Sequence, residues 1–383
     1  MSSRTKPSAS RTPLRQTDPA TTLRHLHDGA VLLDVRSPAE RSCGMPEGAL
    51  GLDLDALADG VATLVPDLDC EVFAICALGQ RSVQAVERLR ELGYRRVASV
   101  AGGFARWQAE GLPTCRDERL DGDMAERYAR QLRLPEIGAD GQHKLARARV
   151  AMLGAGGLGA PAALYLAAAG VGQLTLIDDD RVERSNLHRQ VIHADARVGM
   201  AKTASAALTL QALNPRVHIE QRPERLVAAN VEQLLSGHDV ILDGADNFSA
   251  RFLLSAASLR LRIPMVYGAI ERFRGQVSVF DPRREDSPCY RCLFPEPPAT
   301  GQAPNCSEAG VLGVLPGLVG MLQACETLKL ILALGDTLTG RLLTVDALGM
   351  RFRELRLPRN PACPACASQA RFDGYRDLDG ACT

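Results

Sequence analysis

The chain is 383 residues long, which is enough for two domains of unequal size. Its 45 Lys and Arg residues balance its 45 Asp and Glu residues, so no net charge draws it to nucleic acid or to an anionic membrane. We therefore expect a small or neutral-to-acidic partner, and no binding to nucleic acid or membrane.

Residues 1–17 are polar and rich in Ser and Pro, which indicates a disordered lead rather than a secretory signal. A cytoplasmic location follows as an expectation. The apolar stretch 311–334 contains Pro316, Glu326 and Lys329, so we expect a buried helix rather than a membrane span. Eleven cysteines in a cytoplasmic chain indicate metal binding and thiol chemistry more than disulfides.

Residues 18–117 alternate short apolar strands with helical periods, which predicts a small α/β domain with a parallel sheet. One strand ends in CALGQRS, directly before a helix. Backbone N–H groups and the helix N-terminus stabilise a thiolate at Cys76 in this position. Gly79 lets the loop turn back, Arg81 adds a positive charge and Ser82 can cap the helix. Cys76 is therefore a candidate nucleophile or sulfur carrier.

This segment resembles the rhodanese family, in which an active-loop Cys is followed by four residues, an Arg and then Ser or Thr. The stretches LLDVRSPAE and VAGGFARWQAEGLP resemble its flanking motifs. The resemblance implies sulfur transfer, and the short loop favours sulfur over phosphate. The stretch CGMPEGAL departs from the family pattern, because a His is missing and Cys43 is extra. An inert, buried Cys76 at the strand end is the alternative.

Residues 118–123 are interpreted as a linker, 124–370 as a second domain and 371–383 as a tail. The second domain begins with a strand, a glycine turn and an Ala-rich helix. This arrangement lets backbone N–H groups approach phosphates at a helix N-terminus. The glycines of the turn are Gly154, Gly156, Gly157 and Gly159. By itself the turn predicts only that a nucleotide binds.

Polar residues after the next strands narrow the choice of nucleotide. Asp178 follows a strand and can accept hydrogen bonds from ribose hydroxyls. Asn186, Arg189 and Lys202 bring amides and cations to the same end of the sheet, which suits a triphosphate that loses pyrophosphate. A further predicted strand ends in Asp246, whose carboxylate can bind Mg²⁺. ATP is therefore the predicted nucleotide, and a nicotinamide-dependent oxidoreductase is a less favoured alternative.

The motifs RYARQ, GAGGLG, NLHRQ, VGMAK and DGADN occur in this order and resemble the ubiquitin-activating-type adenylyltransferases of molybdopterin and thiamine biosynthesis. The resemblance assigns Asp178 to the ribose, and Asn186, Arg189 and Lys202 to the phosphates. It makes Asp246 the magnesium ligand. Arg130 matches an arginine that reaches the partner's ATP site in a homodimer, so the resemblance implies a homodimer.

Two Cys-Xaa-Xaa-Cys pairs have the spacing of zinc knuckles. They are Cys289 with Cys292 and Cys363 with Cys366. Four thiolates form a closed Zn²⁺ site, which would attach the C-terminal segment to the loop after Phe280. Redox-active or unpaired cysteines are the alternative. Cys306 lies between the pairs, and in relatives a cysteine at this place takes part in sulfur transfer or is dispensable.

The expected fold is α/β: a small rhodanese-like parallel-sheet domain, then a larger Rossmann-like adenylyltransferase domain with a zinc site. The predicted function is ATP-dependent adenylylation of the C-terminal Gly-Gly carboxylate of a ubiquitin-like sulfur carrier, with sulfur from a Cys76 persulfide. The donor would be thiosulfate or a cysteine desulfurase, and molybdopterin, thiamine, cysteine and siderophore pathways all use such a carrier. An adenylyltransferase with an inactive rhodanese domain, or with one serving another acceptor, is the main alternative. A non-enzymatic binding module would be expected to lack Arg189, Lys202 or Asp246.

Overall fold

The structure is a computed structural model that describes residues 15–42, 44–115, 120–297 and 310–378. The chain forms two compact units, Met1–Gln142 and His143–Thr383, called here the N-terminal and C-terminal units. Each unit is α/β, as predicted. α6 (Gly122–Arg127) spans the predicted boundary at residue 124, and α7 (Gly138–Arg147) spans the point where the two units meet in sequence. The predicted domain boundaries at 117 and 124 therefore remain a proposal.

The N-terminal unit is built on a parallel sheet with the strand order β1-β6-β5-β2-β4. A short antiparallel pair, β3 and β7, lies apart from it. The strands are β1 (Gln16–Thr17), β2 (Val31–Asp34), β3 (Met45–Pro46), β4 (Leu50–Gly51), β5 (Glu71–Ile75), β6 (Arg96–Val100) and β7 (Thr114–Cys115). The helices around it are α1 (Pro19–His27), α2 (Pro38–Ser42), α3 (Leu57–Leu64), α4 (Gln80–Glu91) and α5 (Gly103–Ala109).

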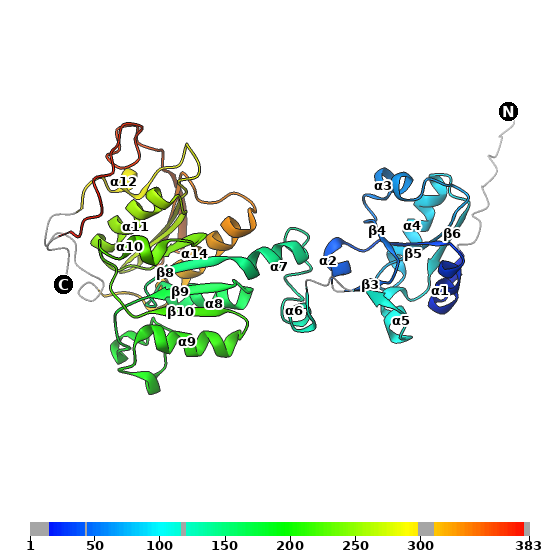
Figure 1. The fold of residues 1–383 in the computed structure, drawn as a ribbon, viewed down its shortest axis with the longest axis horizontal. Coiled ribbons are helices and arrows are strands. Elements are labelled where there is room, and N and C mark those ends of the chain that lie inside the picture. The colour runs from blue at the N-terminus through cyan, green and yellow to red at the C-terminus, as the bar shows by residue number, and fades with distance from the viewer. Residues whose placement is uncertain (1–14, 43, 116–119, 298–309, 379–383) are drawn as a thin grey trace, which may run out of the picture. The chain divides into compact units, whose positions relative to one another are not determined.

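Both faces of this sheet are buried, because neighbouring apolar residues along each strand point to opposite sides. Leu33 and Ala74 pack with α3 and α4, whereas Leu32 and Phe73 pack with α1 and α5. Figure 1 shows these helices on the two sides of the sheet. Cys76 follows β5, which lies inside the sheet between β6 and β2. The sheet therefore places the predicted active thiol at the end of a fully buried strand.

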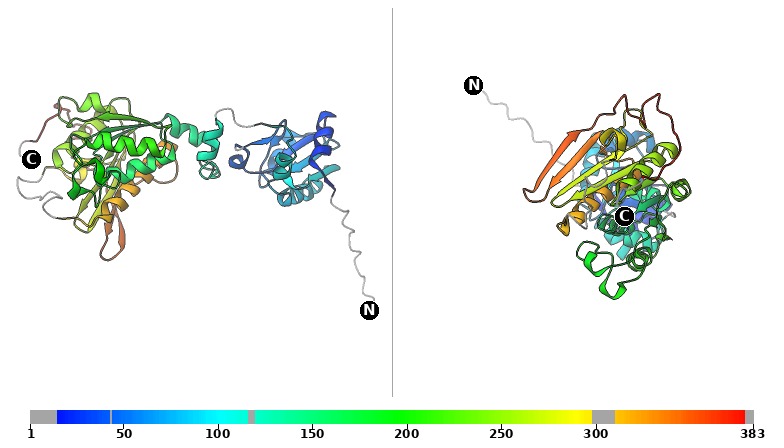
Figure 2. Two further views of the ribbon diagram at one scale, coloured as in Figure 1. Left: turned by 90° about the horizontal axis from the view of Figure 1, so that it is seen from below. Right: turned by 90° about the vertical axis from the view of Figure 1, so that its left-hand side faces the viewer.

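The C-terminal unit is built on an eight-stranded sheet in the order β10-β9-β8-β11-β12-β13-β14-β15. The pairs from β10 to β12 are parallel and the pairs from β12 to β15 are antiparallel. Figure 2 shows the β14–β15 hairpin, in orange, at one edge. The strands are β8 (Arg149–Leu153), β9 (Gln173–Ile177), β10 (His218–Arg222), β11 (Val240–Asp243), β12 (Met265–Glu271), β13 (Arg274–Phe280), β14 (Arg341–Asp346) and β15 (Arg351–Arg356).

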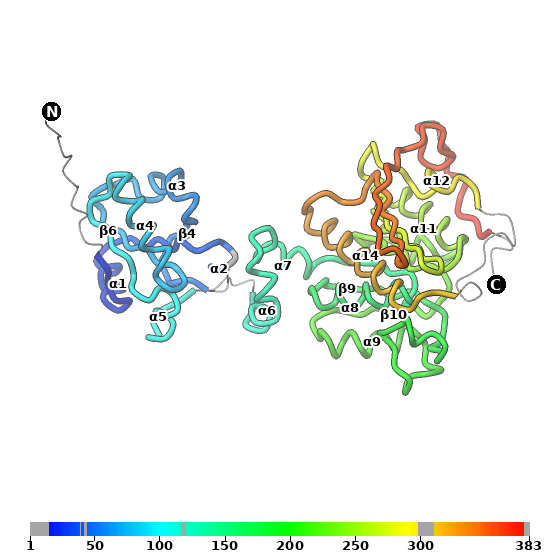
Figure 3. The backbone as a smooth tube through the Cα atoms, turned by 180° about the vertical axis from the view of Figure 1, so that it is seen from behind, coloured from blue at the N-terminus to red at the C-terminus, as the bar shows by residue number. Residues whose placement is uncertain are grey.

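Helices cover both faces of the sheet (Figures 1 and 3). α8 packs against α9 and α14 on one face, and α10 packs against α11 on the other. Their bounds are α8 (Gly159–Ala169), α9 (Lys202–Leu213), α10 (Val231–Leu235), α11 (Phe248–Leu261), α12 (Tyr290–Leu293) and α14 (Val314–Leu332). Within the described part of the chain, α14 is the one helix whose length and hydropathy suit a membrane span. It packs on α8, β12 and β13, which confirms the predicted buried helix.

The structure corrects two predicted boundaries. Gln16 and Thr17, which were expected to belong to a disordered lead, form β1 and pair with Ser99 and Val100 of β6. The strand expected to end in Asp246 ends instead at Asp243. The Oδ1 atom of Asp243 accepts a hydrogen bond from the backbone N–H of Ala245 (2.9 Å). This local side-chain bond turns the chain out of the sheet, so Asp246 lies on the loop before α11.

Candidate functional site

The Cys76 thiol is enclosed by the loop that joins β5 to α4. The residue is 1% exposed. Its Sγ atom accepts a hydrogen bond from the backbone N–H of Gly79 (3.1 Å) and lies 3.5 Å from the Oγ atom of Ser82. Gly79 has φ +96°, so the predicted reversal of the loop at a glycine is confirmed. The loop therefore directs an N–H dipole at the sulfur, as thiolate stabilisation requires.

The N-terminus of α5 supports the loop from the other side. The backbone N–H groups of Phe104 and Ala105 donate to the carbonyl oxygens of Cys76 (2.7 Å) and Ala77 (3.1 Å). Gly103 has φ +62°, and a Cβ atom there would lie 2.3 Å from the Cys76 carbonyl oxygen. Only glycine permits this approach, which explains the Gly-Gly pair in the motif VAGGFARW.

Ser82 does not cap α4 as predicted. The N-cap of α4 is Gly79 in the left-handed conformation, and Ser82 lies three positions inside the helix. Its Oγ atom donates to the Gly79 carbonyl oxygen (3.1 Å) and lies 2.8 Å from the Oγ atom of Ser99. Ser82 therefore braces the loop against β6.

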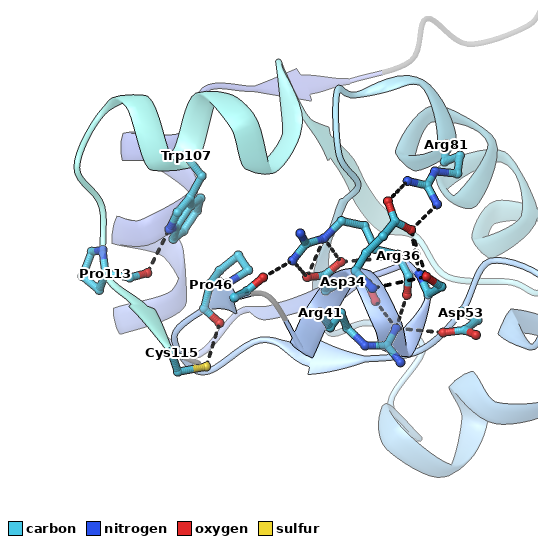
Figure 4. Close-up of polar contacts among 12 residues, drawn as sticks. Asp34, Arg36, Arg41, Pro46, Asp53, Arg81, Trp107, Pro113 and Cys115 are labelled. Carbon is cyan, nitrogen blue, oxygen red and sulfur yellow. Dashed lines mark hydrogen bonds and ion pairs between the residues drawn. The ribbon is translucent and has the colours of Figure 1, made fainter. Parts of the chain in front are cut away.

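Arg81 is paired with a carboxylate from outside the loop (Figure 4). Its NH1 and NH2 atoms donate to Oε2 (2.8 Å) and Oε1 (2.6 Å) of Glu40. This hydrogen-bonded guanidinium lowers the pKa of Glu40 to about 2. Glu40 is part of the motif LLDVRSPAE, but nothing in that motif connects it with Arg81.

A buried ion pair lies in the same motif. Arg36 donates through NH2 to Oδ2 of Asp34 (2.6 Å), and both side chains are almost completely buried. The guanidinium of Arg36 also lies over the ring of Phe104, 3.9 Å from its centroid. This pair joins the end of β2 to α5, and so supports the helix that holds the Cys76 loop.

The parallel strands of the C-terminal unit have the Rossmann order, in which the chain leaves neighbouring strands β8 and β11 in opposite directions. Ligands of this fold bind at the carboxyl ends of those two strands. The glycine turn follows β8, and the DGADN motif follows β11. The topology therefore brings two of the predicted ATP-binding motifs together.

Glycine is required where these two loops meet. Gly154 has φ +89°, and a Cβ atom there would lie 2.7 Å from the carbonyl oxygen of Gly244. A Cβ atom on Gly159 would lie 1.9 Å from the Gly154 carbonyl oxygen, and one on Gly157 would lie 3.0 Å from Pro316. The turn therefore exposes backbone without Cβ atoms and contacts α14 at Pro316. Such a turn lets backbone N–H groups approach a phosphate closely.

Asp178 is attached to the glycine turn. Its Oδ2 atom accepts a hydrogen bond from the backbone N–H of Ala155 (2.8 Å), and its Oδ1 atom accepts one from Asp180 (2.9 Å). Burial raises the pKa of this carboxyl. The predicted ribose ligand thus lies beside the turn, although its ribose role remains a proposal.

Lys202 and Arg189 supply positive charge on the segment after β9. Lys202 is the first residue of α9, its side chain is 6% exposed, and its Nζ atom lies 2.6 Å from Oδ2 of Asp180. Arg189 donates to Oδ1 of Asn186 (2.6 Å). The structure therefore brings Lys202 to Asp178 through Asp180, and it pairs Arg189 with Asn186, as their shared phosphate role would need.

Asp246 is exposed at the start of α11. Its Oδ1 atom accepts a hydrogen bond from the Nδ2 atom of Asn247. The Oδ1 atom of Asn247 caps α11 by accepting a hydrogen bond from the backbone N–H of Ala250 (2.9 Å). An exposed carboxylate here is free to bind a cation, so the side chain fits the predicted Mg²⁺ role.

Two polar residues that we did not predict lie beneath this loop. Asp243 is fully buried, and burial raises its pKa to about 6. Its Oδ2 atom lies 3.5 Å from Nε of Arg251, which donates to the carbonyl oxygens of Ala245 (2.7 Å) and Gly268 (3.2 Å). Arg251 thereby ties the DGADN loop to β12. The Arg five residues after Asp246 was the available sequence signal.

Two further residues of the polar run were also missed. His193 lies 3.0 Å from the Ala155 carbonyl oxygen and 2.9 Å from Oγ of Ser205, so it joins the glycine turn to α9. Gln190 is 5% exposed, its side chain lies against Gly156, and its Oε1 atom has no hydrogen-bond partner. A buried polar atom without a partner beside a Cβ-free turn fits a bound nucleotide.

The four predicted zinc ligands come together. The Sγ atom of Cys289 lies 4.0 Å from that of Cys292 and 3.6 Å from that of Cys363, and the Cys292 and Cys366 sulfurs are 3.5 Å apart. A tetrahedral ion with Zn–S bonds of ~2.3 Å needs sulfur separations of about 3.8 Å. The backbone N–H groups of Asn360 and Ala365 also donate to Cys292 and Cys363. The donor set and its geometry fit Zn²⁺.

Two predicted site residues, Cys306 and Arg130, are not placed in these clusters. Cys306 and Cys43 lie outside the described residues. Arg130 is exposed and follows α6. Its predicted role in a partner's ATP site therefore remains a proposal.

The structure has an α/β fold with a Rossmann-order sheet, a cluster of four cysteines whose geometry fits Zn²⁺, and a separate thiol loop. The family models agree with this. The ThiF family model matches residues 128–365, and the rhodanese-like domain model matches residues 18–110. The chain therefore belongs to the ThiF family and has an N-terminal rhodanese-like domain.

Named relatives are similar to most of the chain. The SAMP-activating enzyme E1 of Haloferax volcanii is 48% identical over 260 residues, which cover 68% of this chain and 95% of that one. The sulfur carrier protein adenylyltransferase of Thermus thermophilus is 48% identical over 67% of this chain and 96% of its own length. The adenylyltransferase and sulfurtransferase MOCS3 of Arabidopsis thaliana is 43% identical over 68% of this chain and 56% of its own.

A solved structure shows the same fold. The crystal structure of E. coli MccB has a TM-score of 0.58 and 19% identity, and the match covers 69% of this chain and 78% of that one. At this identity the likeness supports the fold of the C-terminal unit alone.

Proposed function

We propose that this protein uses ATP to adenylylate the C-terminal Gly-Gly carboxylate of a ubiquitin-like sulfur-carrier protein, and then converts it to a thiocarboxylate. The observation that supports this most strongly is the presence in one chain of two built sites. One is the glycine turn with Lys202, Arg189 and Asp246, and the other is the Cys76 loop. Relatives named for activating SAMP and for adenylylating a sulfur carrier support the first half.

In the first step the carrier's carboxylate attacks the α-phosphate of ATP, and pyrophosphate leaves. The glycine turn would bind the phosphates through its N–H groups, with Arg189, Lys202 and Asn186 neutralising or bonding their oxygens. Asp178 would accept the ribose hydroxyls. Mg²⁺ bound at Asp246 would supply further charge neutralisation at the phosphates. Arg130 of a second subunit would complete the site, so we propose a homodimer.

In the second step the terminal sulfur of a Cys76 persulfide attacks the acyl carbon, and AMP leaves. The carrier is then joined to Cys76 through an acyl disulfide. A second thiolate that attacks the Cys76 sulfur releases the thiocarboxylate and leaves a disulfide, which an external thiol must reduce. Cys306 is our candidate for this thiolate. Thiosulfate or a cysteine desulfurase would supply the sulfur.

The remaining assignments follow from these. Zn²⁺ held by the four cysteines is structural, because a closed tetrahedral site has no open position for a substrate. We place the reaction in the cytoplasm, where free thiols persist. Molybdenum cofactor biosynthesis is one pathway that uses such a carrier.

The test separates the two steps. Cys76→Ala should abolish thiocarboxylate formation with thiosulfate as the sole sulfur source, yet leave carrier-dependent pyrophosphate release unchanged, because no ATP-site group is altered. Cys306→Ala should spare adenylation and slow only the transfer. The exposed Cys115 lies in the same unit as Cys76, so Cys115→Ala is the matched control and should change neither step.

Mass spectrometry of the carrier's C-terminus, beside a pyrophosphate assay, reads both steps. Full thiocarboxylate yield from Cys76→Ala would show that the N-terminal domain is not the sulfur donor, and only the adenylylation half of the proposal would stand. Tight NAD binding without ATP binding in calorimetry would support the oxidoreductase alternative instead.

A further inference from the structure

Several charged side chains lie around the Cys76 loop. Arg81 is the cation of the loop itself, and both of its terminal nitrogens donate to Glu40 (2.8 and 2.6 Å). The two side chains are 39% and 27% exposed, so the pair lies at the surface of the N-terminal unit.

Glu40 is fixed in this position independently of Arg81. Its Oε2 atom accepts hydrogen bonds from the backbone N–H (3.0 Å) and the hydroxyl (3.2 Å) of Ser37. The pKa of Glu40 is lowered to about 2, so the carboxylate stays charged at any physiological pH. An anion that approaches Arg81 therefore meets a negative charge that is already bound there.

The other cations packed near the loop are also neutralised. Arg36 is paired with Asp34 (2.6 Å), and Arg106 on α5 is paired with Glu110 (2.7 Å). The N–H groups of Phe104 and Ala105 at the start of α5 are used by loop carbonyl oxygens. Among the described residues of this unit, Arg36, Arg81 and Arg106 are thus each held in an ion pair with a carboxylate.

We propose that Glu40 is a specificity-determining residue that disfavours dianionic sulfur donors at Cys76 and leaves persulfides of low charge as its preferred substrates. The inference rests on the proposed sulfur transfer and specifies its donor class. With thiosulfate, the Cys76 thiolate attacks the outer sulfur, the S–S bond breaks, and sulfite leaves with the electron pair. With a persulfide R–S–SH, the same attack gives the Cys76 persulfide and releases the thiolate R–S⁻.

The experiment measures the second-order rate of Cys76 persulfide formation in the full chain with two probes. One is thiosulfate, and the other is the persulfide of N-acetylcysteamine, which reacts as its uncharged protonated form R–S–SH. Glu40→Gln should raise the thiosulfate rate about tenfold, the factor that one charge interaction of ordinary strength gives. The rate with the uncharged persulfide should change less than about twofold.

Two matched variants define the cause. Glu40→Asp keeps the charge and should keep the low thiosulfate rate. Glu91→Gln removes the same charge at the far end of α4, roughly 15 Å along the helix from Arg81, and should leave both rates unchanged. An unchanged or slower thiosulfate reaction in folded Glu40→Gln would overturn the proposal.

A measurement on the unaltered protein covers the case in which Glu40→Gln does not fold. Added salt should accelerate the thiosulfate reaction, because it screens the repulsion between the dianion and the Glu40 carboxylate, and should not affect the uncharged donor. Slowing by salt would overturn the proposal. If neither donor forms a persulfide at Cys76, the sulfur-transfer function fails, and that result differs from a shift in preference.

Discussion

A Cβ atom on Gly154 would lie 2.7 Å from the carbonyl oxygen of Gly244. The glycine turn after β8 and the loop after β11 therefore meet backbone to backbone. Gly154→Ala should abolish ATP binding in calorimetry and destabilise the C-terminal unit by more than the ~1–2 kcal/mol that left-handed φ costs alanine. Gly237→Ala is the control, because Gly237 has φ +76° but its Cβ would meet only Arg149 at 3.5 Å. Equal effects of the two substitutions would show that the close approach is unimportant.

Asp246→Ala should remove carrier-dependent AMP formation while the melting temperature stays within a few degrees, because the side chain is exposed and packs against little. Asp336→Ala removes a carboxylate beyond the other end of α14, a helix of 19 residues and about 28 Å, and should leave activity unchanged. The readout is radiolabelled AMP, with ATP binding measured at several Mg²⁺ concentrations. Retained Mg²⁺ dependence in Asp246→Ala would assign the cation to another ligand.

One zinc ion per chain should be found by elemental analysis. Cys363→Ser should lose it and destabilise the C-terminal unit by several kcal/mol, because metal binding is coupled to folding. Cys325→Ser removes an exposed thiol of the same unit and should retain the metal. The single Trp107 is fully buried in the N-terminal unit, so its fluorescence should be unaffected by either change. A folded, zinc-free wild-type protein contradicts this prediction.

His193 should make the C-terminal unit less stable in mild acid. Burial lowers its pKa from 6.5 to about 4, so the unfolded chain binds the proton first as the pH falls. The contribution of His193 to the free energy of unfolding is fully present above pH 6.5 and falls by about 3 kcal/mol as the pH drops to 4. Asp243, whose pKa is raised to about 6, acts in the opposite direction, because the folded state then binds the proton first.

A comparison of the wild-type protein with His193→Gln separates the His193 and Asp243 contributions to the pH dependence of stability. The difference in unfolding free energy between wild type and this variant, measured in urea by circular dichroism at each pH, should shrink between pH 6.5 and 4. The Asp243 contribution cancels in that difference. A difference that does not vary with pH would mean that His193 is not held neutral.

Local motifs were predictable because their chemistry depends on residues close in sequence. The Cys76 loop, the glycine turn and both Cys-Xaa-Xaa-Cys pairs are complete within a few positions, and the strand order then follows from the alternation of strands and helices. The N-cap of α4 is Gly79 in place of the predicted Ser82, and this was missed because the sequence does not show which glycines adopt the left-handed conformation.

Contacts between distant positions were not predictable from spacing. Glu40 is separated from Arg81 by 41 residues, and Gln323 on α14 donates to the Asp243 carbonyl oxygen 80 residues before it. Such pairs depend on how helices pack on the sheet, and a charged residue in a motif does not identify its partner. Asp243 and Arg251 were missed for the same reason, since their pairing needs burial to be recognised.

The cysteine pairs also bear on when the protein can finish folding. Cys363 follows Cys289 by 74 residues, and the intervening chain contains α14, β14 and β15. During synthesis the metal site cannot close until Cys366 has been made, after every described strand of the sheet. The N-terminal unit can fold while translation continues, but α14 and the glycine turn in front of it are held in place only after this site has closed. A ribosome-bound chain that stops before Cys363 should therefore carry a folded thiol loop and no metal.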